Sequence, residues 1–146
     1  MDLLVKKLLL IEDNADDEAL TLRVLKKNYA IDEVVVARDG AEAIDYLFAK
    51  GRYDKRDPKD LPEVVLLDVK LPKLDGHEVL KLMREHNDTR LIPVIMLTSS
   101  REEGDVRKSY LLGANGYVQK PVDFGQFTNA VKRIGDYWLE INEIVH

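Results

Sequence analysis

Short apolar runs alternate with longer amphipathic stretches along this chain. The runs are nearly continuous in apolar residues, which is typical of parallel strands that are buried on both faces. We expect strands at 8–11, 34–37, 64–67, 94–97 and 117–119. Between them, apolar residues recur at three- and four-residue spacing, which predicts helices at 16–27, 40–48, 76–86, 102–112 and from 123 onward. This alternation predicts an α/β fold with a five-stranded parallel sheet, right-handed crossovers and helices on both faces.

Four of the predicted strands end in polar residues of different chemical types. Glu12 and Asp13 follow the first strand, Asp68 follows the third, Thr98 the fourth and Lys120 the fifth. In an open parallel sheet the carboxyl ends of the strands meet at one edge, and ligands bind there. We therefore expect these five side chains to form one site.

The residue types in this set favour a metal ion and a phosphate group. Glu12, Asp13 and Asp68 would repel one another unless a cation lay between them. Oxygen ligands alone favour Mg²⁺, which completes its shell with water and substrate phosphate. Lys120 could pair with a phosphate oxygen and Thr98 could donate a hydroxyl, while an aspartate beside Mg²⁺ can act as the nucleophile. Each residue alone is more often a helix cap or a turn residue, so the combination carries the prediction.

Composition narrows the class of protein. The 146 residues suit a single domain over 1–146, with an extended helix or tail at about 135–146. The chain has no cysteine, which excludes disulfides and thiol catalysis, and its net charge of −5 gives no basic field for nucleic acid. It shows neither a signal-peptide layout nor an apolar run of membrane-spanning length. We expect a cytoplasmic protein without nucleic-acid or membrane partners.

The residues around the strand ends resemble the receiver domains of two-component response regulators. The likeness covers 7–134 and rests on LLIEDN at 9–14, VLLDVKLP at 65–72, LDG at 74–76, PVIMLT at 93–98, and the stretch from Gly113-Ala114 to Lys120-Pro121. The resemblance implies a flavodoxin-like (βα)5 fold and a stand-alone regulator. It also implies that Asp68 accepts phosphate from the phosphohistidine of a histidine kinase with Mg²⁺, without enzymatic turnover beyond weak self-catalysed transfer and dephosphorylation.

The resemblance assigns roles within the proposed site. It implies that Asp13 binds the metal ion directly, that Glu12 binds it through water, and that the backbone carbonyl of Lys70 is a further ligand. Thr98 and Lys120 match the residues that contact the phosphoryl group in the family.

The resemblance also implies a switch. Phosphorylation would draw Thr98 toward the phosphate and let Tyr117 turn into the vacated space, which would change the face formed by the fourth helix, fifth strand and fifth helix. Alternatively, Tyr117 is a half-buried strand residue with its hydroxyl in water. The bond between Lys120 and Pro121 is expected to be cis, as in the family.

The end of the chain carries a further apolar pattern at three- and four-residue spacing. Its members are Phe127, Val131, Ile134, Trp138, Ile141 and Val145. The stripe is longer than a last helix needs to cover its sheet, so we expect it to form a homodimer interface. The alternative is that Trp138 folds back onto its own domain. The long charged loop at 50–62 could contact a partner or simply be solvated. Together with the Tyr137-Trp138-Leu139 tail, this loop resembles the corresponding parts of single-domain regulators that partner bacterial phytochrome-type kinases.

Three other functions remain open from the sequence. A Mg²⁺-dependent phosphohydrolase would use Asp68 as its nucleophile, but such enzymes commonly carry a second aspartate two residues later, where this chain has Lys70. A flavodoxin-type electron carrier would need a hydroxyl-rich loop after the first strand, whereas residues 12–17 are mostly acidic. The third is a binding module that works without phosphate.

Overall fold

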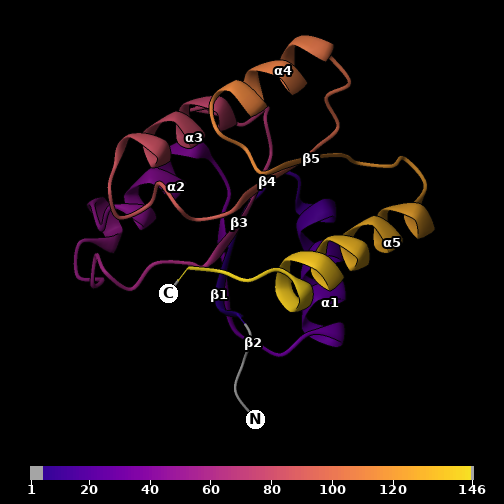
Figure 1. The fold of residues 1–146 in the computed structure, drawn as a ribbon, viewed down its shortest axis with the longest axis horizontal. Helices are drawn as coiled ribbons and strands as arrows, with labels where there is room; N and C mark the ends of the chain where they lie inside the picture. The colour runs from indigo at the N-terminus through magenta and orange to yellow at the C-terminus, as the bar shows by residue number, and fades with distance from the viewer. Residues whose placement is uncertain (1–4, 146) are drawn as a thin grey trace.

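A computed structural model describes residues 5–145 and contains one five-stranded sheet (Figure 1). All strands are parallel, in the order β2-β1-β3-β4-β5. The strands are β1 (Val5–Ile11), β2 (Ile31–Ala37), β3 (Val64–Leu67), β4 (Val94–Thr98) and β5 (Gly116–Gln119). The predicted parallel α/β sheet is therefore confirmed.

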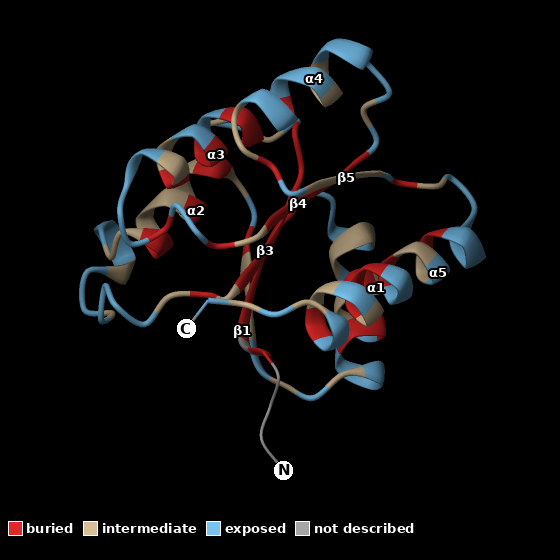
Figure 2. Cartoon of the chain, viewed as in Figure 1, coloured by how far each residue is buried: buried red, intermediate tan, exposed pale blue. Residues whose placement is uncertain are grey.

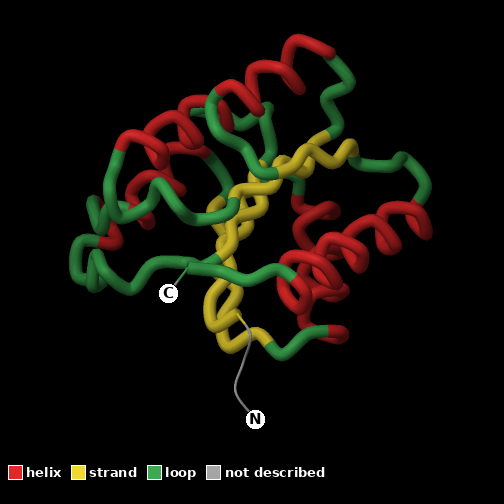
Figure 3. Tube along the Cα trace, in the orientation of Figure 1, coloured by secondary structure: helices red, strands yellow, loops and turns green. Residues whose placement is uncertain are grey.

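Five α-helices cover the two faces of the sheet (Figures 1 and 3). Helices α1 and α5 lie on one face, and α2, α3 and α4 lie on the other. The helices are α1 (Ala15–Asn28), α2 (Gly40–Leu47), α3 (Gly76–Glu85), α4 (Glu103–Leu111) and α5 (Phe124–Gly135). Each predicted helix is present, with ends that differ from the prediction by one residue or so. No helix in the described part of the chain is both long enough and apolar enough to cross a lipid bilayer.

The core consists of two layers, one on each face of the sheet. Because successive strand residues point to opposite faces, Leu9 and Ile11 pack toward α2 and α3, whereas Leu8 and Leu10 pack toward α1 and α5. Figure 2 shows the central strands as the most deeply buried elements. The carboxyl ends of these strands are thereby held in fixed positions.

Strand β1 begins three residues before the predicted start. The prediction began too late because a lysine interrupts the apolar run of this strand. Lys7 lies within the strand and is buried, and its ammonium nitrogen lies 2.7 Å from Asp60 and 3.4 Å from Glu33. Both carboxylates stabilise the charge, so the strand continues through a residue that the pattern reads as a boundary.

Helix α4 is attached to the domain mainly by polar contacts. Among its described residues, Ser109 alone is buried. The Ser109 hydroxyl donates to the Asp105 carbonyl at 2.7 Å and lies 2.9 Å from Nε2 of the buried His77 on α3. Since the one Ser109 hydroxyl proton goes to Asp105, His77 Nε2 is the donor in the contact between α3 and α4.

The predicted interface at the end of the chain is wrong for most of its residues, because they belong to the domain's own core. Phe127, Val131 and Ile134 are buried between α5, α1 and the sheet. After α5 the chain makes a π-helical turn, Asp136–Ile141, which packs Trp138 against the same cluster. Trp138 therefore folds back, and the stripe residues left on the surface are Ile141 and Val145, which are 68% and 66% exposed.

The loop at 50–62 folds onto α2. The Arg56 guanidinium donates to the carbonyls of Tyr46 and Leu47 and stacks on the Tyr46 ring. Arg52 and Tyr53 both contact the Glu42 carboxylate. Three of the loop's large polar side chains therefore make contacts within the domain, although Arg52 remains 65% exposed.

Candidate functional site

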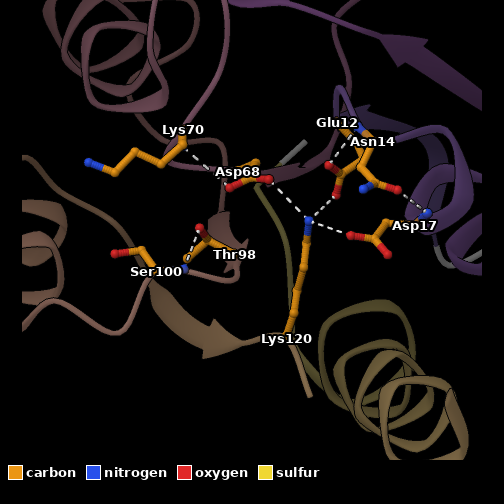
Figure 4. Close-up of polar contacts among 8 residues, drawn as sticks. All are labelled: Glu12, Asn14, Asp17, Asp68, Lys70, Thr98, Ser100 and Lys120. Atoms are coloured by element: carbon orange, nitrogen blue, oxygen red, sulfur yellow. Dashed lines mark hydrogen bonds and ion pairs between the residues drawn. The ribbon is translucent and has the colours of Figure 1, made fainter. Parts of the chain in front are cut away.

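The carboxyl ends of the strands bring the predicted polar residues together (Figure 4). Ile11 and Leu67 are paired across β1 and β3, so the residues that follow them, Glu12 and Asp68, emerge side by side. The backbone N–H of Asp68 donates to the Ile11 carbonyl at 3.1 Å, and that of Lys120 donates to the Thr98 carbonyl at 2.7 Å. Sheet register alone therefore assembles residues that are far apart in the sequence.

A buried lysine ammonium lies at the centre of the site. Lys120 Nζ is 2.7 Å from Glu12 Oε1, 2.9 Å from Asp17 Oδ2 and 3.0 Å from Asp68 Oδ2 (Figure 4). Burial by itself would lower the pKa of Lys120, but these carboxylates outweigh that effect and raise the pKa above its ordinary value. Lys120 is therefore charged, and each of its three N–H donors has a partner.

The peptide bond that follows this lysine is not cis, contrary to the prediction. No cis bond occurs in the described range 5–145, so Lys120 and Pro121 are joined in the ordinary trans form. The trans form is the more stable one for an isolated X–Pro bond, and the ion pairs already fix the lysine in this arrangement.

Glu12 is almost completely buried, and this affects its charge. Desolvation raises the pKa of the Glu12 carboxyl to about 7, with the neighbouring Asp68 charge adding to the rise and Lys120 opposing it. The second carboxylate oxygen accepts the backbone N–H of Asn14 at 3.2 Å. Burial therefore makes the protonated form of Glu12 more favourable than that of a free glutamate.

Three carboxylates could hold a metal ion. Glu12, Asp13 and Asp68 each offer an oxygen, and these oxygens lie within 4.8 Å of one another. Oxygens on opposite sides of a Mg²⁺ ion are about 4.2 Å apart, so a small closure, or a water between one carboxylate and the ion, would complete the fit. Asp13 is exposed beside a cavity of about 470 Å³, which Asp68 and Lys120 also line. The all-oxygen donor set suits a hard divalent cation.

The loop that carries Asp68 is held tightly against α3. The Lys70 backbone N–H lies 3.4 Å from Asp68 Oδ1, and the Lys70 ammonium lies 3.5 Å from Asp105 on α4. At Gly76 a Cβ atom would lie 2.0 Å from the Asp68 carbonyl oxygen, so only glycine fits there. Metal binding by the Lys70 carbonyl stays a prediction.

Thr98 and Tyr117 are linked through the loop between β4 and α4. The Oγ1 atom of the buried Thr98 accepts the Ser100 backbone N–H at 3.2 Å. The Tyr117 hydroxyl donates to the Ser100 carbonyl at 3.1 Å, and the Ser100 hydroxyl donates to Asp105 at 2.5 Å. The Tyr117 hydroxyl therefore has a protein partner rather than only water, and a shift at Thr98 has a direct route to Tyr117 and α4.

Sequence reasoning missed two participants, Asp17 and Ser100. Asp17 lies three residues after Asn14, whose side chain caps α1 by accepting the Asp17 backbone N–H at 2.9 Å. An Asn followed by acids marks a helix start, but nothing in that pattern shows that one of the acids reaches Lys120. Ser100 follows Thr98 by two residues, and its part depends on the loop's folded shape.

Comparison with known proteins agrees with the fold. The family model described as response regulator receiver domain matches residues 8–132. The response regulator Rcp1 of Synechocystis sp. is 38% identical over 135 residues, which are 92% of this chain and 90% of Rcp1. Its Mn²⁺-bound structure superposes with a TM-score of 0.90 at 36% identity and covers 97% of this chain and 99% of that one.

Two further solved structures are similar. The phosphorylated cyanobacterial phytochrome response regulator RcpA gives a TM-score of 0.90 at 37% identity and covers 97% of this chain and 99% of its own. The bacteriophytochrome response regulator AtBRR is 52% identical with a TM-score of 0.72, and the match covers 95% of this chain and 99% of that one.

Proposed function

Because the chain belongs to the response regulator receiver domain family, we propose that Asp68 accepts a phosphoryl group from the phosphohistidine of a sensor kinase. A carboxylate oxygen of Asp68 would form the new P–O bond as the P–N bond of the phosphohistidine breaks. The ring would keep the electron pair of the broken bond and leave as neutral imidazole, because its other nitrogen carries a proton. One observation carries this proposal: the carboxylate of Asp68 lies 3.0 Å from a buried ammonium and within reach of Glu12 and Asp13.

The side chains around Asp68 have complementary parts in this reaction. Lys120 would pair with an oxygen of the arriving phosphoryl group, and the Thr98 hydroxyl would donate to another. Glu12, Asp13 and Asp68, with the Lys70 carbonyl, would hold Mg²⁺. When bound, the ion would neutralise charge on the phosphoryl oxygens, as it does in phosphoryl transfer generally. The protein's own contribution is positioning and charge, so we expect no sustained turnover.

The proposed output is a change on the face formed by α4, β5 and α5. A phosphoryl group adds nearly two negative charges and three acceptor oxygens beside Thr98. Movement of Thr98 would disturb the Ser100 loop, to which the Tyr117 hydroxyl is bonded. Tyr117 would then be free to turn inward, and the surface of α4 would change with it.

The relatives suggest the kind of partner. Because RcpA and AtBRR are described as phytochrome response regulators, we propose a phytochrome-type histidine kinase as the phosphoryl donor. We likewise propose that the protein works in the cytoplasm, together with such a kinase.

A homodimer stays a prediction with a smaller candidate surface. With most of the stripe buried, Tyr137 and Ile141, 47% and 68% exposed, are the apolar residues left on the π-helical turn. Sedimentation with and without a phosphoryl donor tests this prediction, and a monomer at tens of micromolar in both conditions contradicts it.

A small acyl-phosphate donor tests the phosphoacceptor proposal directly. The protein is incubated with acetyl phosphate and Mg²⁺, and intact mass is measured. We expect one added phosphate, which is lost in Asp68→Asn and without the metal, whereas the exposed control Asp88→Asn retains it. Release of many phosphates per chain without a lasting adduct would instead favour a phosphohydrolase.

A further inference from the structure

Asp17 contacts the central lysine of the site from helix α1. Its Oδ2 atom lies 2.9 Å from Lys120 Nζ, and its side chain is 28% exposed (Figure 4). The Asn14 cap fixes the first turn of α1 by accepting the Asp17 backbone N–H at 2.9 Å. The position of this carboxylate is therefore set by the start of the helix.

The local structure leaves the Asp17 carboxylate available for Lys120. An acid at this third helical position commonly turns back to accept the N–H of the capping residue. Here the Asn14 N–H donates to Glu12 at 3.2 Å instead. Asp17 is thus released from capping and pairs with the lysine.

Neighbouring acids in the same turn do not share this role. Glu18 forms an ion pair with Arg38 at 2.9 Å. Asp16 is exposed and forms no ion pair with any described side chain. Asp17 is therefore the acid of the first turn of α1 that pairs with Lys120.

The three ion pairs of Lys120 have different fates in the proposed reaction. One carboxylate oxygen of Asp68 forms the bond to phosphorus, and Glu12 turns toward the metal ion. Asp17 binds neither the phosphoryl group nor the metal ion in this reaction. We propose that Asp17 is a positioning residue that holds the Lys120 ammonium in place while Glu12 and Asp68 change partners, so that the ammonium meets the arriving phosphoryl oxygens. This inference rests on the proposed function.

A simpler role would be stabilisation of the helix dipole, which any acid in the first turn provides. Asp16 provides it equally, because it lies in the same turn, carries the same charge and lines the same cavity. The two roles therefore separate when Asp17→Asn is compared with Asp16→Asn.

The first measurement is the rate of phosphorylation by acetyl phosphate at saturating Mg²⁺. Since small misplacements of a catalytic group cost large factors in rate, we expect Asp17→Asn to slow the reaction about tenfold. Asp16→Asn should stay within about twofold of the wild type. An unchanged or faster rate in Asp17→Asn would overturn the proposal, because Asp17 would then be a dipole acid or a competitor for Lys120.

The second measurement does not depend on phosphorylation. The ε-ammonium of Lys120 in ¹⁵N-labelled protein should give a slowly exchanging NMR signal that survives Mg²⁺ addition in the wild type and in Asp16→Asn. In Asp17→Asn the signal should disappear when Mg²⁺ is added. If it survives there, Asp17 does not anchor the lysine. If the wild type accepts no phosphate, the proposed function fails, while the NMR comparison still tests the anchoring.

Discussion

Replacing Lys120 with Met would remove the ammonium that binds three carboxylates. Met fills most of the lysine stem's volume, so the change is mainly electrostatic. Glu12 and Asp68 are 1% and 6% exposed, and both pair with Lys120 at 3.0 Å or less. Removing one partner of a buried ion pair costs about 3–5 kcal/mol of the free energy of unfolding.

The size of this loss should depend on pH. The pKa of Glu12 is about 7 with Lys120 present, and it rises further without the cation. A carboxyl whose pKa is higher in the folded than in the unfolded state binds more protons when folded. Stability therefore falls as pH rises from the unfolded value toward the folded one. We expect a loss of about 3 kcal/mol at pH 6 and about 5 kcal/mol at pH 8.

Urea unfolding in the presence of EDTA measures this loss, with the single Trp138 as the fluorescent reporter. The control Lys81→Met, on the exposed side of α3, should change stability by less than about 0.5 kcal/mol. Adding Mg²⁺ should stabilise Lys120→Met more than the wild type, because the ion replaces the missing positive charge. Equal urea midpoints for Lys120→Met and wild type at pH 8 would refute the reasoning.

Three further predictions concern other parts of the domain. Gly76→Ala should cost about 2–3 kcal/mol in thermal unfolding, because its Cβ would lie 2.0 Å from a backbone oxygen, whereas Gly104→Ala, with open space around it, should stabilise. Burial, assisted by Lys108, lowers the pKa of His77, so at this residue the unfolded chain binds more protons than the folded one in mild acid. The urea midpoint of His77→Gln relative to that of the wild type should therefore rise from pH 7 to pH 5, and an unchanged difference would contradict this reasoning. Arg56→Ala should speed tryptic cleavage of the loop at 50–62 although it removes a cleavage site, because that guanidinium binds the loop to α2; unchanged cleavage would show that other contacts hold the loop.

The fold was largely predictable from the sequence, because strands buried on both faces must be apolar throughout. The prediction was least accurate where a charge is neutralised inside a strand, as at Lys7 in β1. The spacing of the apolar residues near the end of the chain also could not show whether they form an interface with a second copy or pack in the domain's own core. Phe127, Val131 and Ile134 repeat as an interface would, but they cover their own sheet.

The site was predictable to the extent that strand ends define it. Glu12, Asp68 and Lys120 directly follow strands and Thr98 is the last residue of one, so topology alone brings them to one edge. Asp17 was not predictable, because its part depends on the direction of a helix turn relative to a lysine more than a hundred positions away. The conformation of the bond at Pro121 likewise depends on the folded surroundings.

Helix α4 combines weak burial with a direct link to the site. Since Ser109 alone among its described residues is buried, most of the α4 sequence has little part in the stability of the domain. The same helix carries Asp105, which is bonded to Ser100 in the loop after Thr98. Selection is therefore free to vary the outer residues of α4, and so to change which molecules recognise it, while the phosphorylation chemistry and the core stay the same.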